Sequence, residues 1–355
     1  MESITTLQYS IHFNSTCYNE LNTYLDNSNF SKIFVLVDTD THNYCLSNFL
    51  SQLETQQEIE IIEIESGEIN KTIETCTGVW NALSELNADR KSLLINLGGG
   101  VVTDLGGFVA STFRRGIKYI NVPTSLLAMV DASVGGKTGV DLGVIKNQIG
   151  VINFSEMVLI DTAFLKTLPQ NEMRSGLAEM LKHGLIHDQV YWDKVSNLSQ
   201  FSQEDLDMLI YESVQIKKDV VTQDPNENGL RKTLNFGHTL GHAIESFFLS
   251  DKEKTSLLHG EAIAIGIVLA CYISNKLEGF PTDKLESIKA VMHNKYGKVE
   301  FLDSDYQAII DLLKFDKKNT HGNINFVLLK DIGKTKIDCK VDNEVIFDAF
   351  KYYIS

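Results

Sequence analysis

A change in hydrophobic pattern near the middle of this 355-residue chain constrains its fold more than any other feature. In the first half, short apolar runs rich in β-branched residues alternate with helical patterns, and such runs nearly vanish after about residue 167. The alternation predicts βαβ units around a mostly parallel sheet. The predicted strands cover residues 32–37, 59–64, 92–97, 119–122 and 157–160.

Helical patterns dominate the second half, and one late apolar run at 324–329 predicts a short hairpin strand. A chain of this length exceeds the usual limit for one hydrophobic core, and Leu168-Pro169 supplies a break between the two patterns. We therefore expect an α/β, Rossmann-like nucleotide-binding domain over residues 1–167 and a mostly α-helical domain over 168–355. The predicted helices cover residues 171–187, 204–222, 233–249, 260–275 and 283–293.

Charge and cysteine usage exclude several classes of protein. The formal net charge of −15 argues against nucleic acid as a partner, and it means that an anionic substrate needs a locally basic site. The five cysteines lack CxxC spacing, which favours reduced thiols in a cytoplasm. The N-terminal residues are too polar for a signal peptide, and no apolar run reaches the ~18 residues that span a bilayer, so no membrane association is expected.

Residues 231–242, RKTLNFGHTLGH, place His238 and His242 four positions apart on an expected helix. That spacing stacks two imidazoles on one face, and Arg231 and Asn235 would continue the face upstream. A glycine directly precedes each histidine, which suggests that another group packs closely against the backbone at these positions. The strip predicts a site for an anionic substrate beside a metal, although two partly buried, hydrogen-bonded histidines would give the same spacing.

Three glycines, Gly98 to Gly100, follow an expected strand and precede an expected helix. This geometry presents backbone N–H groups to a phosphate, but a simple tight turn has the same sequence signature. The GxGxxG fingerprint is not met, because Thr103 occupies its third glycine position. Asp38 and Asp40 end an earlier strand, where a carboxylate could bind ribose hydroxyls.

The segment Gly135-Gly-Lys-Thr138 resembles the end of a P-loop, but Asp131 stands where that motif needs its first glycine. The residues before it are typical of a turn and a helix and not of a strand. We therefore reject a nucleotide-triphosphatase site. Asp131, Lys137, Lys146 and Asn147 stand singly among small and apolar residues, which favours a lined pocket.

Six blocks, at residues 98–104, 108–116, 122–139, 176–182, 234–242 and 259–261, resemble the 3-dehydroquinate synthase family. The likeness runs in order over nearly the whole chain. It implies the two-domain fold that this family shares with iron-dependent polyol dehydrogenases. It also implies a cytoplasmic, homodimeric lyase of the shikimate pathway to chorismate and the aromatic amino acids. Such an enzyme converts 3-deoxy-D-arabino-heptulosonate 7-phosphate to 3-dehydroquinate and phosphate, with NAD and zinc or cobalt.

The resemblance also assigns residues to roles. Glu179, His238 and His259 would bind the metal, and Glu227, His242, Lys137 and Arg115 would be catalytic. Substrate contacts would come from Arg115, Asp131, Lys137, Asn147, Lys182, Lys217, Arg231, Asn235, His238, His259 and Lys317 or Lys318. NAD contacts would come from Asp38, Asp40, Glu68, Lys71, Gly99, Gly100, Val101, Asp104, Thr124, Ser125, Lys146, Phe164, Leu165, Lys166 and Thr167.

Three alternatives remain open at this stage: a cyclase for another sugar phosphate, a polyol dehydrogenase that releases NADH, and a descendant without activity. Lys182, Asn235 and His242 are all present, and related cyclases tend to lose one of them. The loop at 141–147 departs from the family pattern, since Ile145 replaces a glycine.

Overall fold

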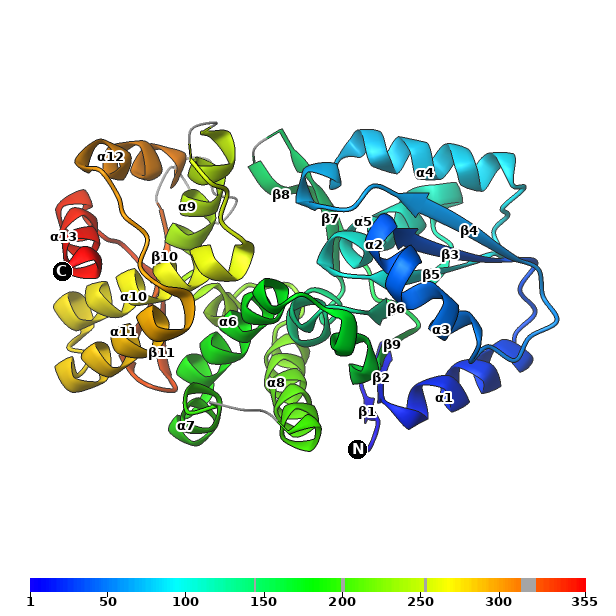
Figure 1. Ribbon diagram of the computed structural model, residues 1–355, viewed down its shortest axis with the longest axis horizontal. Coiled ribbons are helices and arrows are strands. Elements are labelled where there is room, and N and C mark those ends of the chain that lie inside the picture. The colour runs from blue at the N-terminus through cyan, green and yellow to red at the C-terminus, as the bar shows by residue number, and fades with distance from the viewer. Residues whose placement is uncertain (144, 199–201, 252–253, 314–323) are drawn as a thin grey trace. The chain divides into compact units, whose positions relative to one another are not determined.

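The computed structural model describes residues 1–143, 145–198, 202–251, 254–313 and 324–355 of the chain (Figure 1). The chain divides into two compact units, Met1–Met173 and Arg174–Ser355. The predicted boundary, between residues 167 and 168, lies a few residues earlier. The α/β and mainly helical characters predicted for the two parts are confirmed.

The first unit is built on a seven-stranded sheet of order β1-β2-β9-β6-β5-β3-β4. All of its pairings are parallel except β1 with β2. The apolar runs predicted to be strands form β3, β4, β5, β6 and β9. The strands are β1 (Ile4–Thr5), β2 (Ser10–Phe13), β3 (Ile33–Asp38), β4 (Ile59–Ile64), β5 (Leu93–Gly98), β6 (Lys118–Pro123) and β9 (Met157–Ile160).

Strands β3 and β5 are buried along their whole length, as expected of parallel strands covered on both faces. In Figure 1, helices α4 and α5 lie on one side of the sheet and α1 and α3 on the other. One hydrophobic core joins α4 and α5 to the sheet through residues such as Leu36, Val79, Leu94 and Val109. The helices of this unit are α1 (Ser15–Asp26), α2 (Thr39–Thr41), α3 (Ser47–Leu50), α4 (Ile73–Glu85) and α5 (Gly100–Thr112).

The strand order places a topological switch point between β3 and β5. From β3 the chain passes outward to β4 and then returns to the other side of β3 as β5. Loops at the carboxyl ends of such neighbouring strands diverge and leave a crevice for a ligand. The short helical turns that follow strands β3, β4, β6 and β9 are η1 (His42–Leu46), η2 (Glu68–Asn70), η4 (Ala128–Ala132) and η5 (Thr162–Thr167), whereas η3 (Phe113–Arg115) follows α5 and precedes β6.

An antiparallel hairpin, β7 (Lys137–Leu142) with β8 (Ile145–Ile152), was not predicted as strands. Gly139 faces Gly150 across it, and a Cβ on Gly139 would lie 2.4 Å from the carbonyl oxygen of Ile149. The glycines therefore permit close pairing. Strand β7 starts at Lys137, so a strand and not a helix follows Gly135-Gly136, which agrees with the rejection of a P-loop.

The second unit packs helices around α10 (His259–Glu278), which contacts α9, α11, α13 and β10. The length and composition of α10 would allow it to cross a membrane, and the sequence analysis did not expect an apolar run of that length. However, 72% of its apolar window is buried inside the structure, as in the core helix of a globular protein. The predicted hairpin strand forms β10 (Phe326–Asp331), which pairs with β11 (Lys334–Cys339). The remaining elements are α6 (Gln170–His187), α7 (Gln189–Ser196), α8 (Gln203–Gln223), η6 (Leu230–Asn235), α9 (His238–Ser250), α11 (Thr282–Tyr296), α12 (Asp303–Leu312) and α13 (Asn343–Ile354).

The helix predicted over 233–249 is wrong at its start. Residues 230–235 form the separate turn η6, and α9 begins only at His238. Gly237 between them has φ 77°, a left-handed conformation that glycine adopts without steric cost. Arg231 and Asn235 therefore do not continue the helical face of His238 and His242.

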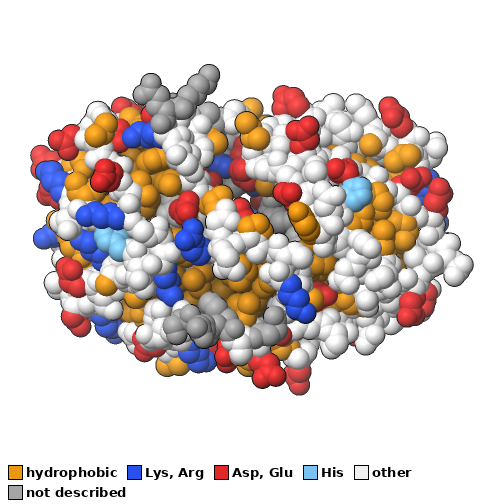
Figure 2. Space-filling model, in the orientation of Figure 1, with side chains coloured by type: hydrophobic (Ala, Val, Ile, Leu, Met, Phe, Trp, Pro, Cys, Tyr) orange, Lys and Arg blue, Asp and Glu red, His pale blue; other side chains and the backbone are white. Residues whose placement is uncertain are grey.

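On the face drawn in Figure 2, basic side chains are interspersed with acidic ones. The acidic side chains are thus dispersed over this face and not gathered into one patch.

Candidate functional site

In the first unit, predicted cofactor residues gather at the carboxyl ends of the parallel strands. Asp38 ends β3, and its carboxylate accepts the N–H of Thr41 at 2.8 Å, which caps α2. Gly98 ends β5, and its carbonyl accepts the N–H of Thr124, just beyond β6, at 3.0 Å. Asp40 lies exposed on α2, Ser125 follows Thr124, and η5 with residues 164–167 follows β9.

The glycine turn is fixed by its surroundings. A Cβ on Gly98 would lie 2.5 Å from Cβ of Val102, and one on Gly99 would lie 3.3 Å from Oγ of Ser125. Helix α5 starts at Gly100, so the first backbone N–H groups of a 13-residue helix face the end of the sheet. Such N–H groups, together with the helix dipole, suit a phosphate.

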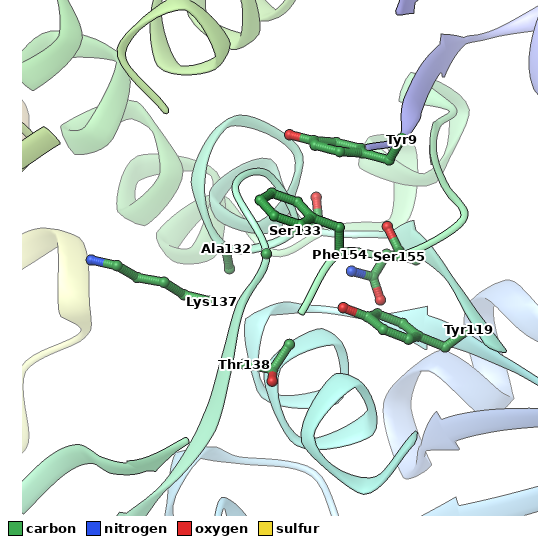
Figure 3. Close-up of a pocket in the computed structure, with 10 residues that line it drawn as sticks. Tyr9, Tyr119, Ala132, Ser133, Lys137, Thr138, Phe154 and Ser155 are labelled. Carbon is green, nitrogen blue, oxygen red and sulfur yellow. The ribbon is translucent and has the colours of Figure 1, made fainter. Parts of the chain in front are cut away.

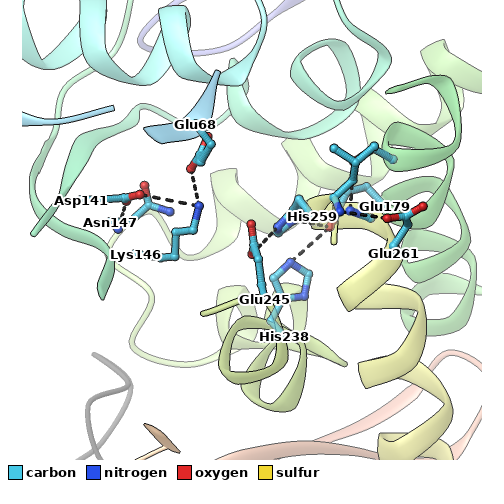
Figure 4. Close-up of polar contacts among 12 residues, drawn as sticks. Glu68, Asp141, Lys146, Asn147, Glu179, His238, Glu245, His259 and Glu261 are labelled. Atoms are coloured by element: carbon cyan, nitrogen blue, oxygen red, sulfur yellow. Dashed lines mark hydrogen bonds and ion pairs between the residues drawn. The ribbon is translucent and has the colours of Figure 1, made fainter. Parts of the chain in front are cut away.

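Five polar side chains form a network beside this turn, here called the lysine network: Lys71, Asp104, Glu68, Lys146 and Asn147. The Lys71 Nζ donates to Asp104 Oδ2 at 2.6 Å and to Asn147 Oδ1 at 2.7 Å, and Lys146 Nζ donates to Glu68 Oε1 at 2.8 Å (Figure 4). Burial opposes the charge of Lys71, but Asp104, Glu68 and Asp141 raise its pKa. The structure thus brings together residues predicted separately.

Asp141 connects the hairpin to this network. Its Oδ1 accepts the N–H of Asn147 at 2.6 Å, and its Oδ2 lies 3.6 Å from Lys146 Nζ. Asn147 has φ 51°, a left-handed conformation that asparagine tolerates better than most residues. Burial raises the pKa of Asp141, while Lys71 opposes that rise. This contact fixes the hairpin end where the sequence departs from the family pattern.

Other predicted residues of this unit lie apart from the lysine network. Arg115 is exposed in η3, beyond the far end of α5 from the glycine turn, roughly 20 Å along the helix axis. Asp131 lies in η4. Lys137 opens β7 beside a small pocket, and its side chain extends away from the rings of Tyr9, Phe154 and Tyr119 (Figure 3).

In the second unit, two imidazoles converge on one carboxylate oxygen. Nε2 of His238 lies 3.2 Å from Oε1 of Glu179, and Nε2 of His259 lies 3.4 Å from the same oxygen. Glu179 is fully buried, and its other oxygen accepts from Lys182, one turn along α6. These four side chains, with His242 and Glu245, are here called the histidine cluster. Figure 4 labels Glu179, His238, His259 and Glu245 of this cluster.

His242 lies beside this convergence. Its ring centroid is 5.1 Å from that of His238 and 5.7 Å from that of His259. Ligand atoms of the three histidines all lie within 4.8 Å of one another, a spacing that could hold a metal ion. His238 is buried, while His242 and His259 are partly exposed, so the cluster has a solvent-accessible side.

Charge and burial act in opposite directions on these groups. Burial alone would raise the pKa of Glu179, but Lys182 and His238 hold it well below its usual range. Burial lowers the pKa of His238, and the nearby Glu179 carboxylate offsets only part of that decrease. Burial also opposes a charge on His259, yet Glu245 and Glu179 raise its pKa to about 10. Glu179 is therefore anionic near neutral pH.

Tight helix packing aligns these side chains. Ser175 Oγ accepts the N–H of Gly260 at 2.9 Å, and a Cβ on Gly260 would lie 2.3 Å from Cα of Ser175. A Cβ on Gly266 would lie 2.1 Å from the carbonyl oxygen of Gly237, and one on Gly241 would lie 2.7 Å from Ile263. What approaches the glycines beside the histidines is therefore helix α10 and not a ligand.

The remaining predicted residues of this unit lie around η6. Arg231 is buried, and its Nη1 donates to the carbonyl of Pro225 at 2.7 Å. Asn235 donates to Oε1 of Glu227 at 2.7 Å, which joins a predicted substrate residue to a predicted catalytic one. Lys217 is buried on α8, which packs against η6. Lys317 and Lys318 lie outside the described residues.

The sequence analysis did not single out two residues that contact the predicted ones. Glu245 Oε2 lies 3.2 Å from His259 Nδ1, and Asp141 holds Asn147. Glu245 follows His238 by seven residues, two helical turns along the same face, so a search of that stripe for acids would have found it. Asp141 has no comparable periodic signal.

Two family models match this chain in succession. The model described as 3-dehydroquinate synthase N-terminal matches residues 61–175, and the one described as 3-dehydroquinate synthase C-terminal matches residues 176–319. Together they cover well over half of the chain.

Curated relatives agree with these models. A 3-dehydroquinate synthase of Parabacteroides distasonis is 42% identical over 336 residues, which is 94% of each chain. One of Sulfurovum sp. is 38% identical over 323 residues, which is 91% of each chain.

Solved structures share the fold. A 2-epi-5-epi-valiolone synthase from Streptomyces hygroscopicus, with NAD+ and Zn2+ bound, has a TM-score of 0.85 at 25% identity, over 99% of this chain and 98% of that one. A 2-deoxy-scyllo-inosose synthase complexed with carbaglucose-6-phosphate, NAD+ and Co2+ has a TM-score of 0.82 at 24% identity, over 99% of both chains. An NADH-dependent butanol dehydrogenase from Thermotoga maritima is more distant, with a TM-score of 0.70 at 13% identity over 100% and 99% of the chains. On the family models and curated relatives together, the chain belongs to the 3-dehydroquinate synthase family.

Proposed function

We propose that this chain converts 3-deoxy-D-arabino-heptulosonate 7-phosphate to 3-dehydroquinate and phosphate, with NAD and a divalent metal ion as cofactors. The observation that carries the proposal is the convergence of His238 Nε2 and His259 Nε2 on Oε1 of Glu179. A neutral imidazole nitrogen without a proton is an acceptor, as is a carboxylate oxygen. Their close approach requires a proton or a metal ion between them.

The donor set fits a catalytic metal. One carboxylate and two imidazoles are three protein ligands of the kind that leave a coordination position open on zinc. Glu179, His238 and His259 would hold the ion, zinc or cobalt, as zinc and cobalt accompany the two solved cyclases. When bound, the metal polarises the substrate oxygens that it contacts, and NAD takes up and returns a hydride.

The residues of the first unit would bind NAD. The N–H groups at the start of α5 suit its pyrophosphate, and Asp38 at the neighbouring strand end suits a ribose. The lysine network lies beside the glycine turn through Asp104 of α5. Residues 1–167 would thus form the NAD-binding domain, and residues 168–355 would bind the metal and the substrate.

The residues of the second unit would counter the negative charges of the substrate. Lys182, Lys217 and Arg231 are all at least nine-tenths buried in a chain whose net charge would repel an anion. Arg231 suits a phosphate because its guanidinium donates two parallel hydrogen bonds. His242 is partly exposed beside the rings of His238 and His259, and it would carry a proton.

The cell context follows from the same family. We propose that the chain acts in the cytoplasm as a homodimer, in the shikimate pathway to chorismate and the aromatic amino acids. The free, buried state of all five cysteines is compatible with a reducing compartment.

Phosphate release tests the activity. The purified full chain is incubated with the heptulosonate phosphate, zinc and NAD at a concentration well below that of substrate. We expect release of phosphate in excess of NAD, with no net NADH. A His238→Ala variant serves as the matched inactive control.

Two other results would replace the proposal. Accumulation of NADH in proportion to substrate would indicate a polyol dehydrogenase. Phosphate release from sedoheptulose 7-phosphate, but not from the carboxylated substrate, would indicate a different sugar-phosphate cyclase.

A further inference from the structure

We propose that Glu245 is a positioning residue of the metal site, because it accepts the Nδ1–H of His259 and so presents the Nε2 lone pair of that ring to the metal. The inference rests on the proposed function, since it concerns a residue behind a proposed ligand. Neither the motif blocks nor the predicted catalytic, metal and substrate residues include Glu245.

The geometry places His259 between two carboxylates. Its Nδ1 lies 3.2 Å from Glu245 Oε2, and its Nε2 lies 3.4 Å from Glu179 Oε1 (Figure 4). Glu245 is only 7% exposed, and Glu179 is fully buried. Each ring nitrogen therefore faces one acceptor, and the two acceptors lie on opposite sides of the ring.

This placement selects a tautomer. A neutral imidazole carries one proton, and the nitrogen without it is the one that can bind a metal. A proton on Nδ1 is stabilised by the Glu245 carboxylate, so the nitrogen that gives up its proton to a metal ion is Nε2, on the side of Glu179. Carboxylates behind metal-bound histidines act in this way, and they also make the ring a stronger donor.

The Nδ1 of His238 is also held by an acceptor, but by a different kind of group. This nitrogen lies 3.1 Å from the carbonyl oxygen of Phe236, a neutral group. A carboxylate holds an imidazole N–H more strongly than a carbonyl does, because the hydrogen bond is charge-assisted. His259 should therefore be the more firmly oriented and more basic of the two imidazoles.

The sequence of α9 explains how one helix serves both rings. Glu245 follows His238 by seven residues, so both side chains project from the same face, two turns apart. Gly241 lies between them, and a Cβ there would meet Ile263 at 2.7 Å and the carbonyl of Ala262 at 3.3 Å. The glycine thus lets α10 approach until the ring of His259 reaches Glu245.

Metal affinity tests the role directly. Metal-free full-length wild type, Glu245→Gln, Glu245→Ala and Glu278→Gln are titrated with Zn2+ in competition with a chromophoric chelator. Glu278 is the matched control, because it is a carboxylate of α10 that pairs with Lys336 at 2.6 Å, away from the cluster. Co2+ absorption in the visible range reports the coordination geometry of each variant independently of activity.

We expect Glu245→Gln to weaken Zn2+ binding about 10-fold and Glu245→Ala up to about 100-fold, with Glu278→Gln unchanged. Glutamine keeps an acceptor oxygen without the charge, so the two variants separate charge from contact. At saturating Zn2+, phosphate release by Glu245→Gln should return to near the wild-type rate, which a catalytic role would not allow.

Several results would overturn the inference. Equal Zn2+ affinity in wild type and Glu245→Gln would overturn it. If His238→Ala, titrated in the same way, then loses Zn2+, the proposed function would still stand. Failure of wild type to bind Zn2+ at all would overturn both. If Glu245→Ala does not fold by circular dichroism, Glu245→Gln alone decides.

Discussion

The lysine network of the first unit and the histidine cluster of the second are both charged and partly buried, but their charges are balanced in different ways. In the network, the two lysines pair with the carboxylates of Asp104 and Glu68 and with the adjoining Asp141, so donors meet acceptors. In the cluster, two imidazole Nε2 atoms face one oxygen of Glu179. The first arrangement is complete without a ligand, whereas the second needs a cation or protons at its centre.

The largest effect should come from removing one converging nitrogen. His238→Ala should abolish stoichiometric metal binding and reduce phosphate release to background, because two protein ligands rarely hold zinc. Metal content after dialysis, measured by atomic emission, checks this. A variant that keeps one equivalent of metal would show that the convergence on Glu179 is not a metal site.

His242→Ala should separate proton transfer from metal binding within the same cluster. We expect normal metal content and a loss of turnover of about 10²–10⁴-fold, the usual contribution of a positioned acid or base. Metal content and phosphate release are measured on the same sample. Equal loss of metal in His238→Ala and His242→Ala would contradict the division of roles between them.

Breaking the lysine network should cost stability even without ligand. Lys71→Met removes the buried cation that pairs with the partly buried Asp104, and breaking a largely buried pair destabilises by up to about 3–5 kcal/mol. Lys118→Met, which removes the more exposed pair with Glu156, should cost about 1 kcal/mol or less. Urea denaturation measures the free energy of unfolding of both variants. Equal decreases would mean that the lysine network stabilises the fold no more than the exposed pair does.

The smallest predicted effect tests the helix packing beneath the cluster. Gly266→Ala should destabilise by about 1–3 kcal/mol, because its Cβ would lie 2.1 Å from the carbonyl of Gly237. Gly78→Ala on α4, where a Cβ meets nothing within 4 Å, should instead stabilise by about 0.4–1 kcal/mol. Thermal unfolding of both variants measures the difference. A neutral Gly266→Ala would show that α9 and α10 can move apart.

Much of the first unit could be predicted because its signals are local. Strands such as β4 and β9 coincide with apolar runs, and the glycine turn follows β5 as expected. The hairpin β7–β8 was missed, because its glycines and polar residues are typical of a loop. Only pairing between the two segments makes them strands.

The histidine pair also shows which features could be predicted from the local sequence and which could not. Its four-residue spacing and its place on one helix were readable from the sequence, and α9 confirms them. The upstream continuation of that helix was wrong, because Gly237 turns the chain into the left-handed region. The close approach inferred from the glycines is real, but the approaching object is α10.

The sequence by itself determined the division into an α/β and a helical half, five strands of the sheet, the glycine turn and the family to which the chain belongs, since these depend on neighbouring residues and ordered motifs. The tertiary structure decided which residues meet: Glu179 with His259, 80 positions apart, and His259 with Glu245, 14 positions apart. The physical reason is that helix packing sets these contacts. Helix packing depends on glycines of one helix lying against the backbone of another. The sequence of a single segment does not specify which helix its glycines will contact.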